Sequence, residues 1–396
     1  MTQEQRILLS VLRHAISPDM PLPDTDCDWA LVFREARQQA VSLIFYDAVS
    51  QQLPQMPPEV QQQIKTLGMQ VVLSNINIGN TQARLTALLT QQNIPHLILK
   101  GEASAAYYPK PELRTLGDVD FWVRAEDYDT LHRLFQNMGY RFDQGQHDHH
   151  ITYHTPGGVV EMHRDLPGMP EGLPGKRLAE ALTNLPSRTR KVNIGSGEFT
   201  APEPALHGLI LLLHSQHHLL SQGLGLRHLM DWHCYVNQTK EAPFWNELLT
   251  LLKEIGLFRF AQVLTGVCAL AFDAPLPHWA TADPALCNGI LEDILSGGNF
   301  GQKDATRQAS GLMTADTQRS KLSGLFKIFH LSVKAHYPIC QKCALFYIVF
   351  YPVRGLRYFW MILTGKRESI IKAIPQADQR RMLYGQLNIF EVEENG

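Results

Sequence analysis

Two aspartates two positions apart, Asp118 and Asp120, are the feature that most constrains the fold of this 396-residue chain. They lie in the segment LGDVDFWV, whose polar and apolar residues alternate as in a β-strand. Alternation places both carboxylates on one face of the strand, with Val119 and Phe121 on the other. Neighbouring carboxylates raise each other's pKa, and a cation between them removes that cost. The pair therefore predicts a divalent metal site, and oxygen ligands suit Mg²⁺ or Mn²⁺.

A third carboxylate, Glu161, lies in the segment VVEMH, which is predicted to form a hairpin with HITYHT across a PGG turn. We expect Glu161 beside the aspartates in the same sheet, with His163 on its face of the strand. The HDHH stretch before the hairpin, with His147 and His149, is expected to be a polar loop. Three such carboxylates are typical of metal-assisted phosphoryl or nucleotidyl transfer. The alternative is that the aspartates are surface residues near a strand end.

The segments around the aspartate strand predict a compact α/β unit of strand, helix, strand, helix and hairpin. An apolar strand, IPHLILKG, precedes a short helix, EASAAYY, which Pro109 ends. An amphipathic helix is expected over EDYDTLHRLFQNMGY, with Gly139 near its end. Residues 166–175 read as a loop or linker. A further hairpin is expected over RKVNIGSGEFTA, with its turn at Gly195–Gly197.

Helical patterns flank this unit on both sides. Apolar positions recur at helical spacing in ILLSVLRHAI and WALVFREARQQAVSLIFYDAV, and a third helix is expected over Val60 to Leu89. After residue 200 the helical segments predict a bundle. We therefore expect four regions, which are an N-terminal helical region over 1–90, an α/β core over 91–200, a helical bundle over 201–318 and a basic, aromatic helical tail over 319–396.

The core motif runs LILKGEASAAYYPKPELRTLGDVDFWV and then VVEMHRDL. It resembles a bacterial family of poorly characterised nucleotidyltransferase-like proteins within the polymerase-β-like nucleotidyltransferase superfamily, over about residues 94–166. The helical flanks, including LRHLMDW, are similar to that family too. The resemblance implies an α+β fold, in which helical regions flank a small mixed β-sheet. It also implies a metal-dependent enzyme that uses Mg²⁺ or Mn²⁺ to transfer an NMP from an NTP to an unidentified hydroxyl acceptor.

The resemblance implies roles for individual residues at the metal site. Asp118 and Asp120 would bind both metal ions. Glu161 would complete one metal site and orient or deprotonate the acceptor. These three carboxylates are therefore the expected catalytic and metal-binding residues.

The resemblance also implies a nucleotide-binding set, which comprises Lys100, Gly101, Arg114, Gly117 and His163. Gly101 would let the backbone approach the phosphates, and the N-terminus of the helix from Glu102 would help to neutralise them. Lys100 and Arg114 would contact phosphate or organise the acidic cluster. The alternative for Lys100 is that it is a lysine at the end of a strand, where it reaches solvent or pairs with Glu102.

The first turn departs from the wider superfamily, which usually has a Gly-Ser pair whose hydroxyl holds phosphate. This chain has Lys100-Gly101-Glu102 there, with Ser104 following. The departure keeps open a second function, that of a catalytically inactive nucleotide- or metabolite-binding module. A third function, suggested by the basic and aromatic C-terminal region, is that of an interaction protein that uses this region.

The helical region after residue 200 contains a second group of polar residues. His214 and His218 have the i, i+4 spacing that can bind zinc, but no nearby cysteine or carboxylate completes a site. A helix lining a cleft, or buried histidines with satisfied partners, is therefore favoured. Arg227 and Asp231 have the same spacing, which is typical of an ordinary helix ion pair. The alternative is that this region faces the nucleotidyl site and supplies acceptor contacts.

Composition excludes several classes of protein. The formal net charge of −2 gives no global field toward nucleic acid, which is not an indicated partner. Six cysteines are too sparse for a disulfide framework, and one C-x-x-C, Cys340 and Cys343, is weak evidence for zinc. The N-terminus lacks the pattern of a signal peptide. The longest apolar stretch, from Ala344 to Val353, is shorter than a membrane span. We therefore expect a cytoplasmic location.

The C-terminal tail has ten basic residues and one acid, Glu368, between Arg319 and Lys372, with aromatic residues interleaved. We expect its helix to pack an aromatic face on the core while its charges stay in solvent. The alternative is contact with an anionic membrane surface or with nucleic acid.

Overall fold

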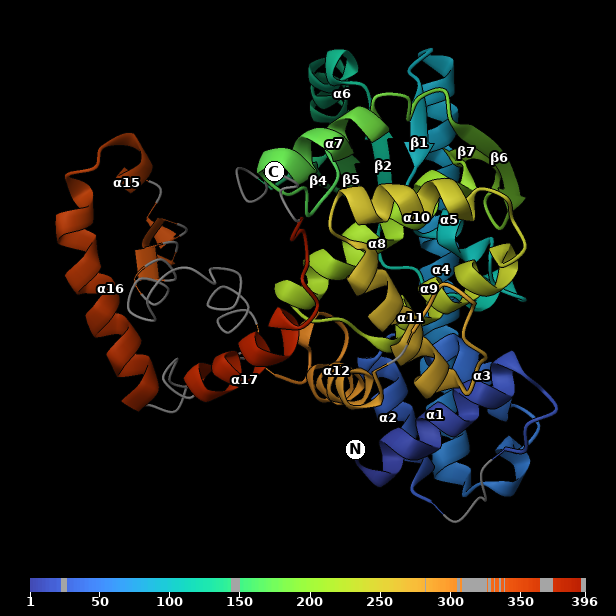
Figure 1. The fold of residues 1–396 in the computed structure, drawn as a ribbon. Helices are drawn as coiled ribbons and strands as arrows, with labels where there is room; N and C mark the ends of the chain where they lie inside the picture. The colour runs from blue at the N-terminus through green and yellow to red at the C-terminus, as the bar shows by residue number, and fades with distance from the viewer. Residues whose placement is uncertain are drawn as a thin grey trace.

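The computed structural model describes residues 1–22, 27–143, 150–281, 283–304, 339–363 and 373–392, and, between 305 and 338, residues 307, 326, 329–330, 332–334 and 336–337. Two small sheets pack against many helices, so the fold is α+β, as predicted (Figure 1).

The larger sheet has the strand order β1-β2-β5-β4-β3. Its strands are β1 (His96–Ile98), β2 (Val119–Val123), β3 (Arg141–Phe142), β4 (His150–Thr155) and β5 (Gly158–His163). β2 and β5 are parallel, whereas the other neighbours are antiparallel, so the sheet is mixed. The predicted hairpin of HITYHT and VVEMH is confirmed as β4 and β5. It lies beside the aspartate strand because β5 pairs with β2.

The register of this sheet brings the predicted polar residues together. Asp120 on β2 is the direct neighbour of Glu161 on β5, and His163 is opposite Trp122 on β2. Across the hairpin, His150 on β4 pairs with His163. Directly opposed residues in adjacent strands point to the same face of a sheet. One sheet face therefore carries Asp120 and Glu161 side by side.

The opposite face of the sheet is covered by two helices, α4 (Pro58–Gln91) and α6 (Ala125–Asn137). Leu89 of α4 and Phe135 of α6 are buried in one hydrophobic cluster with Phe121 of β2. The alternation of LGDVDFWV thus places Val119 and Phe121 on the face opposite the carboxylates, as predicted, and both residues are buried in this core. The second hairpin is also confirmed, as β6 (Thr189–Ile194) and β7 (Gly197–Pro202).

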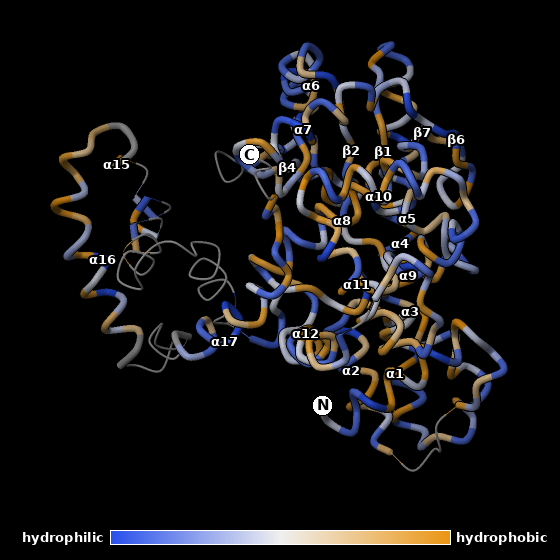
Figure 2. The backbone as a smooth tube through the Cα atoms, viewed as in Figure 1, coloured by the Kyte–Doolittle hydropathy of each residue, from blue (hydrophilic) through white to orange (hydrophobic). Residues whose placement is uncertain are grey.

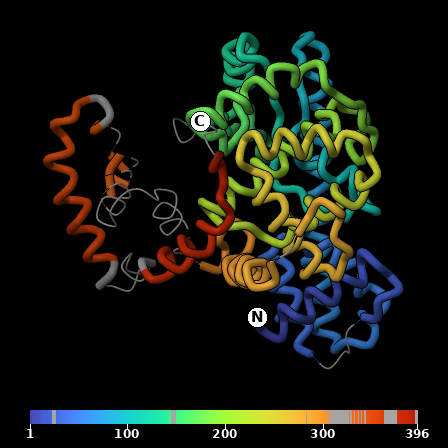
Figure 3. The backbone as a smooth tube through the Cα atoms, in the orientation of Figure 1, coloured from blue at the N-terminus to red at the C-terminus, as the bar shows by residue number. Residues whose placement is uncertain are grey.

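The N-terminal helices and the bundle share a single hydrophobic core, in which Leu8, Trp232 and Leu264 are almost fully buried. Blue and orange helices consequently lie together in Figure 3, and Figure 2 shows hydrophobic residues along these helices. The helices that contribute to it include α1 (Gln3–Ile16), α2 (Trp29–Gln38), α3 (Ser42–Val49), α8 (Pro204–Leu220), α9 (Leu226–Thr239), α10 (Trp245–Glu254), α11 (Phe258–Phe272) and α12 (Pro284–Gly297). Short 3₁₀ turns occur at Leu53–Gln55, Pro111–Leu113 and Asn299–Gly301.

Three predicted segments differ from the structure. The run WALVFREARQQAVSLIFYDAV forms two helices, because Ala40 has a φ of 57° and breaks the pattern between α2 and α3. The segment EASAAYY gives only a four-residue helix, α5 (Glu102–Ala105). The expected loop over 166–175 overlaps a helix, since α7 (Gly172–Leu182) begins inside it.

The tail contains α15 (Ile339–Lys342), α16 (Phe346–Leu363) and α17 (Ala373–Gly385). α16 stands apart from the body of the protein (Figure 1) and exposes apolar side chains, with Leu356 72% and Trp360 56% exposed. The prediction that this helix packs its aromatic face on the core is therefore wrong for α16. Within the described ranges, none of the helices has the length and apolar character needed to cross a membrane.

Candidate functional site

A pocket lies where the polar face of the sheet meets α8 and α9. All the site residues predicted from the sequence line it, namely Lys100, Gly101, Arg114, Gly117, Asp118, Asp120, Glu161 and His163. The helical region after residue 200 also contributes lining residues that were not predicted to bind nucleotide, including His214, His218, Arg227, His228 and Phe300. The helices after residue 200 therefore face the carboxylates, as the alternative interpretation of that region held.

The three carboxylates form a compact group. One oxygen from each of Asp118, Asp120 and Glu161 lies within 4.8 Å of the other two. Burial, and then the charge of Asp120, raises the pKa of Asp118 to about 7. Burial and a neighbouring carboxylate both disfavour the ionised form of Asp118, and a bound cation would offset both effects. The donor set is suitable for a hard divalent cation, because every ligand is a carboxylate oxygen.

Lys100 is the positive group closest to this cluster. Its Nζ lies 2.7 Å from Asp120 Oδ1, and the Nε2–H of His163 donates to the same oxygen at 2.9 Å. Burial opposes the charge on Asp120, but Lys100 and His163 outweigh it and lower the pKa of this carboxyl well below its usual range. Burial likewise opposes the charge on Lys100, yet the carboxylates raise the pKa of its ammonium. Lys100 therefore pairs with Asp120 and not, as the alternative had it, with Glu102.

The turn after β1 depends on Gly101, whose φ of 61° and ψ of −118° are unfavourable for a residue with a Cβ. This turn brings the Gly101 backbone beside the carbonyl of Asp118. The following helix has only four residues, so the implied contribution of its N-terminus to phosphate binding is not supported. The Glu102 carboxylate accepts hydrogen bonds from Gln82 and Ser196, and Ser104 is fully buried.

Arg114 has a different partner from the expected one. Its guanidinium donates to both oxygens of Asp231 on α9, at 2.7 Å each, and the Tyr108 hydroxyl donates to Asp231 as well. Burial opposes the charge of Asp231, and Arg114 is the largest influence that lowers the pKa of this carboxyl. Both side chains are almost fully buried. The ion pair therefore joins the segment before β2 to α9, and Asp231 does not serve as the helix partner of Arg227.

Arg227 is consequently presented to the pocket. Its Nη1 donates a long hydrogen bond of 3.4 Å to the carbonyl of Thr115, and its guanidinium lies 5.5 Å from the ring centre of Phe300. A Cβ added to Gly117 would come within 3.4 Å of Nη1. Burial, and then the nearby Arg114, lowers the pKa of Arg227. Among the charged side chains of the pocket, Arg227 is thus a buried cation suited to an anionic ligand.

His150 also lines the pocket beside the carboxylates. Its ring centre lies 4.9 Å from that of His163, and its Nε2 lies 3.7 Å from Glu161 Oε1. His147 and His149 fall outside the described residues. The sequence contains a signal for His150, because counting back from the PGG turn pairs it with His163. No comparable local signal points to Arg227 or His228, since a helical pattern does not show what a polar residue on the helix faces. None points to Phe300, which lies in the 3₁₀ turn at Asn299–Gly301.

Comparison with known proteins gives a family. Residues 25–273, more than half of the chain, match the family described as "Uncharacterised nucleotidyltransferase". No curated protein matches the chain. Among solved structures, an antigenic nucleotidyltransferase-like protein from Paracoccidioides brasiliensis is 16% identical, with a TM-score of 0.29 over 50% of this chain and 94% of that one. The family match alone shows that the chain belongs to this family of uncharacterised nucleotidyltransferases.

Proposed function

We propose that this protein transfers a nucleoside monophosphate from an NTP to a hydroxyl-bearing acceptor in a divalent-metal-dependent reaction. The observation that carries the proposal is the group formed by Asp118, Asp120 and Glu161 in a pocket that also contains the cations Lys100 and Arg227. Membership of a nucleotidyltransferase family supports a nucleotidyl transfer function. The acidic group supports binding of the metal that this chemistry needs.

The carboxylates would hold the metal. Lys100 and His163 both contact Oδ1 of Asp120, so Oδ2 of Asp120 is the oxygen we assign to the metal, together with oxygens of Asp118 and Glu161. Mg²⁺ or Mn²⁺ at this position would neutralise the triphosphate and lower the pKa of an attacking hydroxyl. Lys100, which contacts Oδ1, would supply part of the positive charge beside the carboxylates when no metal ion is bound.

The triphosphate would lie between the Gly101 turn and α9. Arg227 would donate hydrogen bonds to phosphate oxygens, since its guanidinium is buried in the pocket and its hydrogen bond to the Thr115 carbonyl is long. Gly101, which lacks a side chain, would allow close approach of the backbone to the same phosphates. Arg114, which the family resemblance assigned to phosphate or to the acidic cluster, would instead position α9 through its ion pair with Asp231.

The acceptor hydroxyl would approach from the open side of the carboxylate group. Glu161 is 21% exposed, whereas Asp120 is 2% exposed, so Glu161 is the more accessible base. The hydroxyl oxygen would bond to the α-phosphorus as the bond from that phosphorus to the bridging oxygen breaks. Pyrophosphate would leave with the bonding electrons, and the hydroxyl proton would pass to Glu161.

The direct test is self-labelling and NTP turnover with ATP, GTP, CTP and UTP labelled at the α-phosphate, in the presence of Mg²⁺ or Mn²⁺. We expect incorporation by the wild-type chain and a loss of at least about 100-fold in Asp118→Asn and Asp120→Asn. Asp47→Asn, which alters an exposed ion pair with Lys110, is the matched control and should keep full activity. Labelling that persists in both pocket variants would rule out this mechanism.

A nucleotide- or metabolite-binding module without transfer activity is the second candidate function. The observation that favours it is the Lys100 ammonium, whose contact with Asp120 Oδ1 already supplies positive charge that a metal ion would otherwise supply. Calorimetry separates the two candidates. NTP affinity that is unaffected by Mg²⁺ and by Asp118→Asn supports the binding module, whereas affinity that depends on both supports the enzyme.

A further inference from the structure

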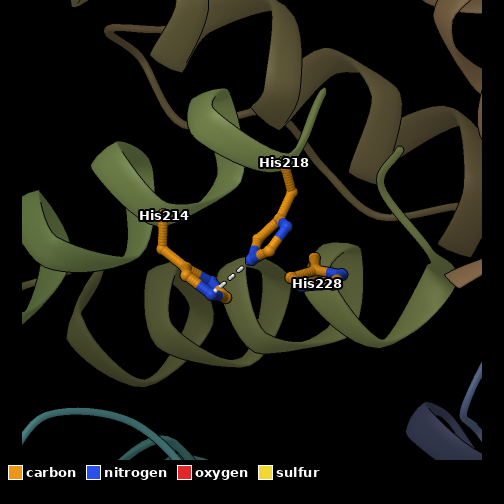
Figure 4. Close-up of side chains that lie close together, drawn as sticks. All are labelled: His214, His218 and His228. Atoms are coloured by element: carbon orange, nitrogen blue, oxygen red, sulfur yellow. Dashed lines mark hydrogen bonds between the residues drawn. The ribbon is translucent and has the colours of Figure 1, made fainter. Parts of the chain in front are cut away.

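Three histidines from two helices form a separate cluster in the pocket. His214 and His218 lie one turn apart on α8 and face each other, and His228 of α9 lies close to both (Figure 4). The ring centres are 4.2 Å apart for His214 and His218, and 5.4 Å and 5.3 Å from these two to His228. One ligand nitrogen from each ring lies within 4.8 Å of the other two. The cluster thus offers three converging nitrogen atoms.

Burial keeps these rings neutral. It is the largest cause that lowers the pKa of His214 and His218 well below the usual value and that of His228 to about 3. Neutral imidazole is the form that binds metal ions. A protonated ring would be unfavourable here, because Lys100 and Arg227 also lower these pKa values.

The contact between His214 and His218 is close to the geometry of two ligands on one ion. Their Nε2 atoms lie 2.7 Å apart, which is the distance of a hydrogen bond with one shared proton. On a tetrahedral zinc ion with Zn–N bonds of about 2.0–2.1 Å, two ligand nitrogens are about 3.3 Å apart. An ion that replaces the shared proton would therefore require the rings to separate by only about half an ångström.

His228 supplies an independent indication of a ligand. Its Nε2 is buried and makes no hydrogen bond within the described part of the chain, and the residue is only 3% exposed. A buried nitrogen without a partner is costly, and a metal ion would provide the partner. The other ring nitrogen, Nδ1, accepts from the Gly225 N–H at 3.3 Å. Coordination through Nε2 places the ring proton on Nδ1, so this long contact would open and the metal–nitrogen bond would have to outweigh its loss.

We propose that His214, His218 and His228 bind a transition-metal ion, Zn²⁺ in the first instance, with a fourth ligand position open to the pocket. Imidazole nitrogens suit Zn²⁺, whereas Mg²⁺ prefers oxygen, so this site is chemically distinct from the carboxylate group. Phe300 packs against the rings of His218 and His228 and helps to hold them in place. The proposal does not depend on nucleotidyl transfer.

Cobalt substitution tests the site without any activity assay. The full-length chain is freed of metal with a chelator and titrated with Co²⁺, whose visible absorption reports the coordination geometry. We expect one equivalent of Co²⁺ with the intense bands of a four-coordinate site, displaced by Zn²⁺. Zn²⁺ should also raise the melting temperature of the wild-type chain by preferential binding to the folded state. A wild-type chain that shows neither effect would overturn the proposal.

Matched variants locate the bound ion. His214→Gln, His218→Gln and His228→Gln should each weaken Co²⁺ binding by at least about 10-fold, as expected for loss of a ligand. His217→Gln removes a neighbouring histidine of the same helix and pocket and should leave binding unchanged. Glu161→Gln is the second control, because Glu161 belongs to the two other groups of potential ligands found among the described residues, with the aspartates and with His150 and His163. Binding that is lost in Glu161→Gln but kept in the three ligand variants would contradict the assignment.

Discussion

Arg114 and Asp231 lie 117 residues apart in the chain, and the guanidinium binds both carboxylate oxygens at 2.7 Å. The pair connects the segment that enters the aspartate strand with α9, which carries Arg227 and His228 into the pocket. Its geometry explains why two arginines near the carboxylates have different roles. Arg114 is neutralised by Asp231, whereas Arg227 presents its guanidinium to the pocket.

The buried ion pair is expected to stabilise the fold. Asp231→Asn leaves the Arg114 guanidinium buried without a counter-charge, which should lower the free energy of unfolding by roughly 3–5 kcal/mol. Denaturant unfolding followed by circular dichroism measures the change. Asp47→Asn removes an exposed pair with Lys110 and should cost less than about 1 kcal/mol. Equal effects of the two substitutions would show that the buried pair is not a structural link.

Arg227 is expected to bind the triphosphate. Arg227→Gln should weaken NTP binding by about 10-fold or more, which corresponds to about 1.4 kcal/mol, because a charge-assisted hydrogen bond is lost. Calorimetric titration with a non-hydrolysable NTP gives the dissociation constant. The control is Arg124→Gln, which removes an exposed arginine bonded to Asp127 outside the pocket. Unchanged affinity in Arg227→Gln would remove this residue from the nucleotide site.

Lys100 is expected to compete with the metal for the acidic group. Lys100→Met removes a positive charge 2.7 Å from Asp120 and should tighten Mn²⁺ binding at the carboxylates by about 10-fold. The number and affinity of bound Mn²⁺ ions can be followed by electron paramagnetic resonance. Lys110→Met, at the exposed pair with Asp47, should leave Mn²⁺ affinity unaltered. Weaker Mn²⁺ binding in Lys100→Met would instead mean that the ammonium helps to assemble the site.

Buried histidines should make the fold sensitive to acid. Burial lowers the pKa of His233 to about 4, below the value of about 6.5 expected in the unfolded chain. The unfolded state therefore binds more protons, so this stability is fully present above pH 6.5 and is lost as the pH falls through about 4. At pH 5 the loss from this one residue should be about 2 kcal/mol.

The variant His233→Phe isolates this effect, because its ring can pack on Phe272, whose centre lies 5.1 Å from that of His233. Melting temperatures of the variant and the wild type should be similar at pH 7.5 and should diverge at pH 5 in favour of the variant. His207, whose pKa burial lowers to about 3, has the same sign and should keep part of the acid sensitivity. A constant difference between the two proteins across this pH range would contradict the prediction.

Local sequence patterns were sufficient for the strands and their acidic residues. A period of two residues predicted Asp118 and Asp120 on one side of a strand, which in the structure begins one residue after Asp118, and the PGG turn predicted the hairpin that carries Glu161. These features depend on neighbours in the chain, so they can be read without the tertiary structure. Local patterns were less reliable for the helices. Helical spacing of apolar residues continues through Ala40, although the backbone leaves the helical conformation there.

Only the tertiary structure decided which residues face the carboxylates. The parallel pairing of β2 with β5, strands that are not consecutive, put Asp120 next to Glu161. Arg114 binds Asp231 because the chain brings a loop and α9 together, and that contact left Arg227 for the pocket. His214, His218 and His228 meet for the same reason. A helix pattern shows which face is buried but not what that face meets, since long-range packing depends on the whole chain.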